Sequence, residues 1–455
     1  MAKNFLKSEE NDIKGIWTRI KTRNFKGNTG IAVKNSVYNF SKTLVAKIGS
    51  LIFTIIIARL LMPELFGLYS LALSTILIFS VISKLGINQA LVRFISWASG
   101  KKTKKVKGYI LYFGKIKFML IALSILLILA FSGFISESYY QKPIFLALLA
   151  GIFYVAFSQI TSFLWSLLNS FNNFKSVFFG ETIFQVSRIV LVPLAVIYAL
   201  KISLSQEGIL FSVIFFLALA YLISGIYLFF VSKKEVLLKL KNTKKQQTLS
   251  FKEKKEVNKF IFLSSAIVLS EVFFGNIDKV MLGRFVAGEF IGYYQAAFSL
   301  IGALASLGMF GGVLLPIFSR MGKKGLDKAM KRTLRMVLLV SIGLFILTLL
   351  FSEAAIFIVY GQEYILATNI LRLLSILVFI IPVTSIYMSY FMSKNKPGIV
   401  AKSLIWSTIL NIALNYILIT SLLKYGEIAA VYGAAIATII SQGVYFGILV
   451  WHRKG

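Results

Sequence analysis

Residues 57–74 read IARLLMPELFGLYSLALS, and residues 282–299 read LGRFVAGEFIGYYQAAFS. The two stretches align without a gap. The positions that agree include arginine, glutamate, glycine and tyrosine, which chance similarity between two apolar segments would not preserve together. The identical pairs are Arg59 and Arg284, Glu64 and Glu289, Gly67 and Gly292, Tyr69 and Tyr294, Ala72 and Ala297, and Ser74 and Ser299. At the same offset Gly86 falls on Gly311, so the chain contains two similar halves.

Lipid is the solvent that organises this chain. Hydrophobic residues make up 58% of the 455 residues and the mean hydropathy is +0.81, above the roughly 45–50% apolar usage of soluble domains. Apolar runs of about 20 residues, long enough to cross a hydrocarbon core, recur throughout. The sequence therefore predicts an all-α integral membrane protein with about twelve spans. The predicted spans are 43–61, 68–85, 109–131, 144–166, 178–200, 208–231, 260–283, 291–315, 335–352, 367–391, 399–421 and 429–451.

The formal net charge of +33 indicates topology. Lysines and arginines crowd alternate loops, as expected when positive charge is retained on the cytoplasmic side, so nucleic acid is not an expected partner. The basic loops contain Lys101, Lys102, Lys104, Lys105 and Lys107, the stretch 233–259, and Arg320, Lys323, Lys324, Lys328, Lys331 and Arg332. The short loops of the other side carry Glu64, Glu137, Glu207, Glu289, Glu353, Glu363 and Glu427. We therefore expect a multi-pass protein of the plasma membrane with both termini in the cytoplasm.

Four segments follow from this pattern. We expect a basic cytoplasmic N-terminal arm over residues 1–42, a first bundle over 43–231, a basic cytoplasmic linker over 232–259 and a second bundle over 260–455. The arm lacks the apolar core of a signal peptide. Each bundle should hold about six helices, so both start on the same side and are related by an axis along the membrane normal, which is a parallel repeat.

Little in the sequence suggests catalysis. There are no cysteines, which excludes disulfides and cysteine-ligated metals, and the single histidine, His452, lies close to the end of the sequence. Neither a D-x-D nor an H-E-x-x-H signature occurs. We expect no enzymatic activity, no catalytic residue, no metal site and no cofactor.

Three motifs carry a resemblance to a known family. They are A-R-x-L-x-P-E-x-x-G-x-Y at 58–69, G-I-N-Q-A-L-V-R-F at 86–94 and N-I-D-K-V-M-L-G-R-F at 276–285. They resemble polysaccharide-export flippases of the Wzx type, which share a superfamily with the multidrug and toxin extrusion (MATE) exporters and the peptidoglycan lipid II flippases. The resemblance covers nearly the whole chain beyond the N-terminal arm. It implies a V-shaped pair of six-helix bundles around a central cavity, which carries a polyprenyl-diphosphate-linked oligosaccharide from the inner to the outer leaflet.

Charged side chains inside the spans mark the candidate sites, because each costs roughly 2.5–3.5 kcal/mol to insert. In the fifth span Glu181, Gln185 and Arg188 follow at intervals of four and three residues, which places them on one helix face. In the seventh span Glu271 and Asp278 lie about two turns apart on one stripe. Such faces should point at a polar cavity or at a partner helix.

A functional interpretation gives these residues two roles. A diphosphate needs guanidinium or ammonium donors once it leaves water, while carboxylates can bind protons or sodium. The candidate substrate ligands are Arg188, Arg372, Lys47, Arg59 and Arg284, with Asn411 and Asn415 as hydrogen-bonding partners of sugar hydroxyls. The candidate ion-coupling carboxylates are Glu271, Asp278 and Glu181.

Each candidate also has a structural interpretation. Opposite charges can pair inside a bundle, and long side chains near span ends can extend to the interface. The possible pairs are Asp278 with Lys279 and Glu181 with Arg188, and the residues near span ends are Arg59, Arg284 and Lys47. Asparagines commonly join membrane helices, so the pair Asn411 and Asn415 fits that role as well.

Transport of a lipid-linked oligosaccharide, for surface polysaccharide or glycoprotein glycan synthesis, is the leading hypothesis. Membrane lipids and either protons or sodium ions are further expected partners, and a monomer is the expected form. The rival within transport is a MATE-type ion-coupled exporter of small organic molecules, which mid-span arginines disfavour because they repel cations. A membrane enzyme, such as an oligosaccharide polymerase or ligase, would present a large outer loop, whereas the outer loops here are short. A scaffold without transport activity stays open.

Overall fold

The computed structural model describes residues 27–101, 103–240, 247–308, 323–394 and 396–454. Several predicted features lie outside these residues: the arm up to residue 26, positions 241–246 of the linker, the eighth span from residue 309, and Lys102, Gly311 and Arg320. The described part is almost wholly helical and contains no strand. The all-α class is therefore confirmed.

The helices of the first half follow the predicted spans. They are α2 (Gly27–Lys84), α3 (Ile87–Lys101), α4 (Val106–Gly133), α5 (Phe145–Ser170), α6 (Phe174–Lys201) and α7 (Gln206–Leu240). A kink at Met62, where φ is 59°, divides α2 into the first two predicted spans. It precedes Pro63, whose ring removes a backbone N–H and clashes with the preceding turn. In the described residues 11 helices are long and apolar enough to cross a membrane, and the union of two spans in α2 explains the difference from about twelve.

The helices of the second half also match the prediction. They are α8 (Phe251–Phe285), α9 (Gly288–Gly308), α11 (Lys323–Tyr360), α12 (Ala367–Leu374), α13 (Ile376–Ser393), α14 (Pro397–Leu423) and α15 (Glu427–Lys454). Together α12 and α13 cover the predicted tenth span. The polar stretch between the halves is partly helical, because α7 continues to residue 240 and α8 begins at residue 251.

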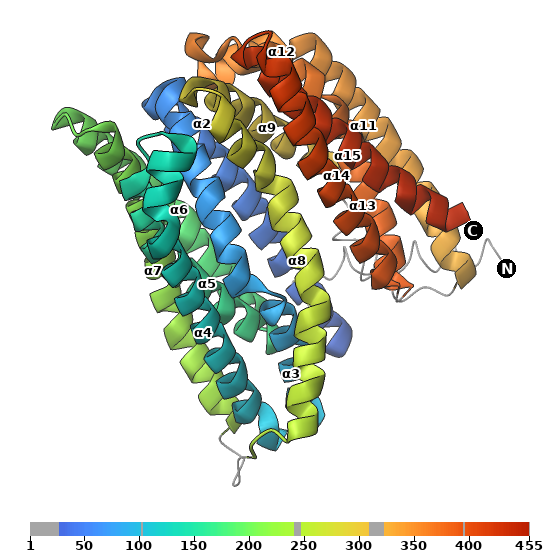
Figure 1. The fold of residues 1–455 in the computed structure, drawn as a ribbon. Coiled ribbons are helices and arrows are strands. Elements are labelled where there is room, and N and C mark those ends of the chain that lie inside the picture. The colour runs from blue at the N-terminus through green and yellow to red at the C-terminus, as the bar shows by residue number, and fades with distance from the viewer. Residues whose placement is uncertain (1–26, 102, 241–246, 309–322, 395, 455) are drawn as a thin grey trace.

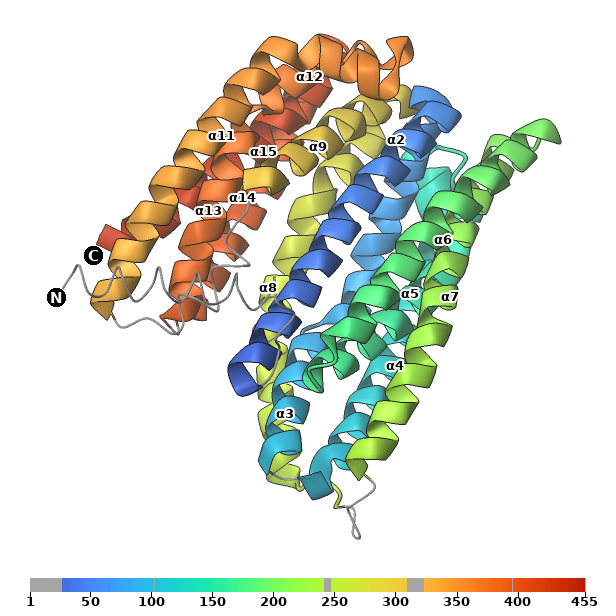
Figure 2. The same cartoon turned by 180° about the vertical axis from the view of Figure 1, so that it is seen from behind.

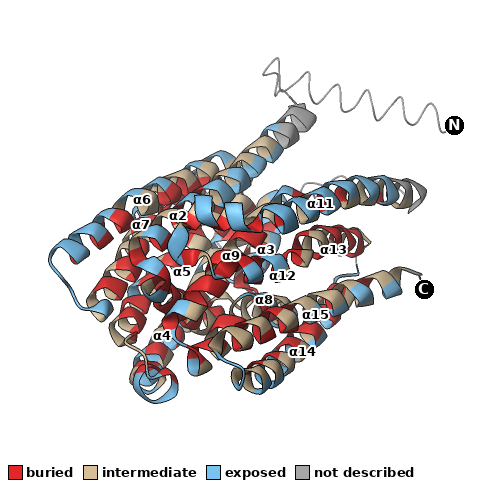
Figure 3. Cartoon of the chain, turned by 90° about the horizontal axis from the view of Figure 1, so that it is seen from above, coloured by how far each residue is buried: buried red, intermediate tan, exposed pale blue. Residues whose placement is uncertain are grey.

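The two groups of helices form a V, as the resemblance implies. Helices α2 to α7 form one arm and α11 to α15 the other, and the arms converge where α2, α9 and α12 meet (Figure 1). They diverge toward the end that carries α3 and the C-terminus, as the view from behind also shows (Figure 2). Buried residues lie mainly where helices face one another, and exposed residues point outward (Figure 3). Many outward residues are large and apolar, such as Phe118 at 74% exposure, so the outer surface suits lipid.

The arms meet at a crossing of two glycine-containing helices. A Cβ atom on Gly67 of α2 would lie 1.8 Å from the carbonyl oxygen of Gly288 on α9, and one on Gly292 would lie 2.1 Å from the carbonyl oxygen of Pro63. Only residues without a side chain permit backbones to approach this closely. Gly67 and Gly292 are partners in the sequence repeat, and a rotation axis that passes between the halves would bring such partners together.

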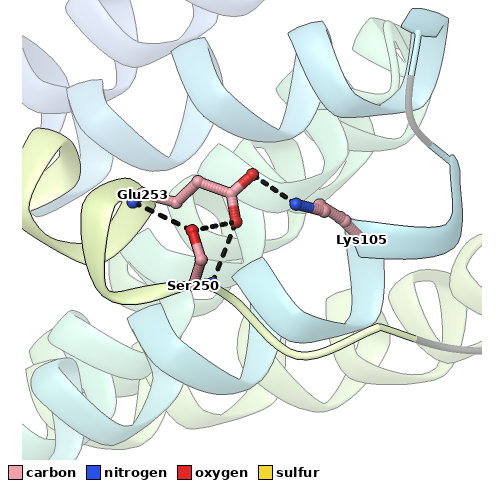
Figure 4. A network of polar contacts seen from close by, with 3 residues as sticks. All are labelled: Lys105, Ser250 and Glu253. Atoms are coloured by element: carbon pink, nitrogen blue, oxygen red, sulfur yellow. Dashed lines mark hydrogen bonds and ion pairs between the residues drawn. The ribbon is translucent and has the colours of Figure 1, made fainter.

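The beginning of α8 is fastened to the first half. Lys105 donates to Glu253 at 2.5 Å, and Ser250 and Glu253 form a capping box at the start of α8 (Figure 4). The backbone N–H of Gln247 donates to the carbonyl of Lys104 at 2.9 Å. Because the capping box satisfies N–H groups that the first turn of a helix leaves free, this contact both starts α8 and docks it beside α3 and α4.

We expect the side on which the V is open to face the cytoplasm, because the basic loops lie there. Thr248 is exposed between α7 and α8, and the chain has no native cysteine. A cysteine at Thr248 should therefore resist an impermeant maleimide in intact cells and react after permeabilisation, whereas Ser205→Cys, in the loop before α7, should react in intact cells. Labelling of Thr248→Cys in intact cells would contradict the predicted topology and place this loop outside.

Candidate functional site

A central cavity of about 490 Å³ is enclosed by helices α2, α5, α6 and α7 of the first half and by α8 and α9 of the second. Its wall comes from both halves, chiefly from α2 of the first and from α9 of the second. Three cations line it: Lys47, Arg188 and Lys279. No acidic side chain lines it in the part of the chain that the structure describes. The wall is therefore cationic, and in a low dielectric it favours an anionic occupant.

Arg188 of α6 lines this cavity and has nitrogen atoms without a hydrogen-bond partner. Its guanidinium lies between two phenyl rings, 4.7 Å from the ring centre of Phe53 and 5.0 Å from that of Phe184. Such cation–π contacts stabilise the position of a guanidinium without using its N–H donors. Its Nε and Nη2 atoms are buried and have no hydrogen-bond partner. Because unpaired buried donors are costly, this arrangement suits a ligand that accepts from them.

The other polar residues of the same α6 face are paired with each other. The side chain of Gln185 donates to Glu181 at 2.6 Å, and both residues are buried. Gln185 also packs closely against Gly49 of α2, where an added Cβ would lie 2.4 Å from its amide oxygen. The three residues that were predicted to share one helix face therefore have different surroundings. Arg188 lines the cavity, whereas Glu181 and Gln185 are buried where helices pack together.

Tyrosines form a further part of the cavity wall. Tyr69, Tyr154 and Tyr221 line it, and the ring of Tyr221 stacks on Phe184 with 4.0 Å between centres. Aromatic rings offer flat apolar surface, and tyrosine adds a hydroxyl that can hydrogen-bond. The sequence analysis did not predict that tyrosines line the cavity. One signal was available, because Tyr69 recurs as Tyr294 in the sequence repeat.

Asp278 lies in a separate polar cluster behind the cavity wall. The carboxylate accepts hydrogen bonds from the hydroxyl groups of Tyr294 and Thr438, both at 2.6 Å, and from the amide of Asn415 at 2.7 Å. The residue is only 3% exposed. The side-chain amide of Asn411, one turn from Asn415, is buried and has no partner at either of its polar atoms. Asn415 thus lies with Asp278, and neither asparagine lines the cavity.

Arg59 and Arg284, partners in the repeat, make reciprocal contacts between the halves. Arg59 donates to the carbonyl oxygens of Ile358 and Val359 near the end of α11, at 2.5 and 2.9 Å. Arg284 donates to the carbonyl of Tyr139, in the π-helical turn after α4. Cations at these carbonyls complement groups that a helix end leaves unpaired. Both arginines therefore fasten the convergent end of the V and do not line the cavity.

Two further candidates lie away from the cavity. Arg372 contacts Glu353 at 3.6 Å, with 44% of its side chain exposed. Glu271 of α8 is exposed and is not part of the cavity lining. Another cation, Lys117, is 3% exposed and donates to the carbonyl of Ser83 and to Gln159. Because the chain leaves the helical conformation after Lys84, that carbonyl has no helical partner and Lys117 supplies one.

The arrangement offers binding chemistry and no evident metal centre. The described residues contain no group of three or more histidine, cysteine or carboxylate side chains that could hold a metal ion. The cavity brings together Arg188 and Lys47 from the predicted ligands and adds Lys279, which the sequence had marked only as a neighbour of Asp278.

This fold defines a multi-pass helical membrane protein with two bundles and a central cavity. Residues 32–322 match the family described as polysaccharide biosynthesis protein, so the chain belongs to that family. The inward closed conformation of the lipid II flippase MurJ has a similar structure, with a TM-score of 0.68, 18% identity and coverage of 92% of this chain and 87% of that one. A multidrug resistance MATE family transporter in its inward-facing conformation gives a TM-score of 0.66 at 12% identity, covering 90% of this chain and 94% of that one. At these identities the structures establish the fold alone.

Two relatives are similar in sequence. The chain is 26% identical over 201 residues to Agl15 of Haloferax volcanii, described as a probable low-salt glycan biosynthesis flippase. That match spans 43% of this chain and 41% of the relative's length. MJ1068 of Methanocaldococcus jannaschii, an uncharacterized membrane protein, is 21% identical over 406 residues, which cover 85% of this chain and 76% of that protein.

Proposed function

We propose that this protein flips a polyprenyl-diphosphate-linked oligosaccharide from the inner to the outer leaflet of the plasma membrane. The observation that carries the proposal is the cationic cavity, which is lined by Arg188, a residue with unpaired buried donors, and by Lys47 and Lys279. The family, whose name refers to polysaccharide biosynthesis, and the description of Agl15 as a glycan biosynthesis flippase support the same cargo.

The residues suggest how the cargo is held. A diphosphate carries charge that two lysines and an arginine can match, and a guanidinium can bind phosphate through two parallel hydrogen bonds. The tyrosines beside Arg188 offer surfaces for the first sugars. The polyprenyl chain stays in the bilayer, because apolar chains lose nothing by remaining in lipid. Rotation of the arms about their convergent end then exposes the cavity to either leaflet in turn.

The Asp278 cluster supports coupling to a cation. Hard cations prefer oxygen ligands, and the cluster offers a buried carboxylate together with the unpartnered side-chain oxygen of Asn415. We propose sodium or a proton as the coupled ion at Asp278. Glu181 and Glu271 are weaker candidates, because the first is bonded to Gln185 and the second is exposed.

A MATE-type exporter of organic cations is the second candidate, and the fold by itself allows it. The cavity disfavours it, because its described lining has three cations and no carboxylate and therefore repels a cationic cargo.

Reconstitution separates the two candidates. Purified protein in liposomes should move a fluorescent polyprenyl-diphosphate disaccharide to the outer leaflet, where an added enzyme or oxidant modifies the sugar. It should move the same disaccharide on an uncharged polyprenyl carrier much more slowly, because only the diphosphate engages the cavity cations. Equal rates for both lipids, or uptake of tetraethylammonium instead, would reject the proposed cargo.

A further inference from the structure

Helix α3 is amphipathic, and it lies on the side of the first arm that faces the open V (Figure 1, Figure 2). Its apolar residues are buried against α4, α5 and α8. They are Ile87, Ala90, Leu91, Phe94, Ile95 and Ala98. Gln89 and Arg93, one turn apart on the other face, are exposed. No described residue of α3 lines the central cavity, so the proposed binding site leaves this exposed face without a role.

Arg93 rests on aromatic rings. Its guanidinium carbon is 4.6 Å from the ring centre of Phe260 on α8 and 5.9 Å from that of Phe94. Within the described part of the chain it forms no hydrogen bond and no ion pair. Cation–π contacts hold a guanidinium in place and leave its N–H donors free. Arg188 is held in the same way by two phenyl rings, so the chain has two arginines that rings position and that keep unpaired donors.

The junction between α2 and α3 keeps Arg93 beside α8. Gly86 has a φ of 65°, and a Cβ on it would lie 2.2 Å from the Oγ of Ser264 and 2.8 Å from the carbonyl oxygen of Ile261, both on α8. Glycine alone permits this turn and this close approach. Phe260 directly precedes Ile261, so the same contact brings its ring to α3. The motif at 86–94 therefore supplies the turn, the arginine and one of the two rings.

Lys84 lies between Arg93 and the cavity. Ser70 and Leu77 of α2 line the cavity, and residues seven apart share a helix face, so Lys84 continues this face toward α3. At 1.5 Å per residue it lies roughly 10 Å beyond Leu77. It is partly buried, and no described residue pairs with it. The two cations thus extend the positive charge of the cavity toward the open end of the V.

No described carboxylate neutralises these two cations. Glu256 lies one turn before Phe260 on α8, but neither Lys84 nor Arg93 forms an ion pair with it in the described structure. A purely structural role, in which Arg93 joins α3 to α8 through Phe260, would need only the ring contact. Free guanidinium donors are what a phosphate needs, because a guanidinium binds phosphate oxygens through two parallel hydrogen bonds.

We propose that Arg93, together with Lys84, forms an entry site that binds the diphosphate of the lipid carrier before it moves into the central cavity. The inference rests on the proposed lipid-linked cargo and adds a second binding position for it. Charges at the rim of a binding site chiefly raise the association rate and its dependence on salt. The entry site therefore sets how readily the cavity is loaded.

Protection of a cysteine on α3 tests occupancy of this site. The chain has no native cysteine, and Gln89→Cys places one on the exposed face, one turn before Arg93. In full-length protein in phosphatidylcholine nanodiscs, a polyprenyl-diphosphate disaccharide should slow maleimide labelling of this cysteine at least about fivefold, the effect of one surface cation on an anion. The same disaccharide on an uncharged polyprenyl carrier should not protect it. Arg93→Gln should abolish protection, whereas Arg188→Gln should keep it, because the carrier still reaches α3 when the cavity binds it poorly.

Flipping kinetics give a second readout. In phosphatidylcholine liposomes, Arg93→Gln should raise the carrier concentration at half-maximal rate about fivefold and weaken its dependence on salt, with a much smaller effect on the maximal rate. Arg93→Lys should keep the salt dependence, because it keeps the charge. Arg332→Gln is the matched control, since it removes an exposed arginine from α11 in the other arm, and it should behave as the wild type. A variant Arg93→Gln that loses only thermal stability would show a structural role and overturn the proposal.

The remaining outcomes separate the entry site from the proposed cargo. Loss of protection in Arg188→Gln would mean that the carrier binds in the cavity alone, and equal protection by phosphatidylglycerol would mean that the site binds phospholipid head groups; either result overturns the entry site and leaves the cargo intact. A wild type that neither flips the carrier nor is protected by it would overturn both. If Arg93→Gln fails to fold, Lys84→Gln decides the question, because it leaves the ring contacts of Arg93 in place and should also weaken protection.

Discussion

Arg188→Gln should abolish most glycan translocation while leaving the protein inserted in the membrane at normal levels. The guanidinium lies between Phe53 and Phe184 in the cavity wall, and two of its nitrogen atoms have no hydrogen-bond partner. Glutamine retains hydrogen bonding but carries no charge, and charge-assisted hydrogen bonds to phosphate are roughly twice as strong as neutral ones. We expect a loss of at least about tenfold, since hydrogen bonds to charged groups contribute about 1.5–3 kcal/mol. Complementation of surface glycan display, with protein levels checked by blot, measures the effect.

Two companion variants sharpen this test. Arg188→Lys should retain part of the activity, because it keeps the charge and loses only the two-pronged geometry of the guanidinium. Arg372→Gln is the matched control, since this arginine is half exposed, contacts Glu353 and does not line the cavity. Normal surface glycan from the Arg188→Gln variant would show that this arginine is not a substrate ligand. Loss of surface glycan from Arg372→Gln alone would indicate that the substrate site lies near α12 in the other arm.

Gly67→Ala should strongly destabilise the protein and stop transport. The added Cβ would lie 1.8 Å from the carbonyl oxygen of Gly288 and 2.7 Å from the backbone nitrogen of Gly292. Backbone atoms cannot rotate away as a side chain can, so α2 and α9 must separate at the point where the arms of the V meet. Overpacking of this kind costs about 3 kcal/mol. The midpoint of thermal unfolding in detergent should fall, and surface glycan should disappear.

Gly343→Ala provides the control, because it makes the same substitution in a helix where no atom lies within 4 Å of the new Cβ. Alanine favours a helix over glycine by roughly 1 kcal/mol, so this variant should be as stable as the wild type or slightly more so. If Gly67→Ala unfolds at the same temperature as Gly343→Ala, the close crossing does not hold the arms together.

The reciprocal arginines show how far a repeat in the sequence can lead. The pairing of Arg59 with Arg284 was visible without a structure, and their placement near span ends suggested a structural role beside the binding role. Each in fact donates to carbonyl oxygens at a helix end of the opposite half. Spacing along one helix cannot reveal such a partner, because the partner lies far away in sequence: Val359 is 300 positions from Arg59.

The sequence by itself determined the all-α membrane fold, the spans, the division into two similar halves and the presence of buried charge. These properties depend on local composition, since about 20 apolar residues must cross the bilayer as a helix whatever surrounds them. Only the tertiary structure decided which charges meet. It brought Arg188 and Lys279 into one cavity and placed Asn415 in the cluster of Asp278. The physical reason is that a polar residue in an apolar span gives the same sequence signal whether it faces a cavity or a partner helix, and the packing of distant helices determines which of these it faces.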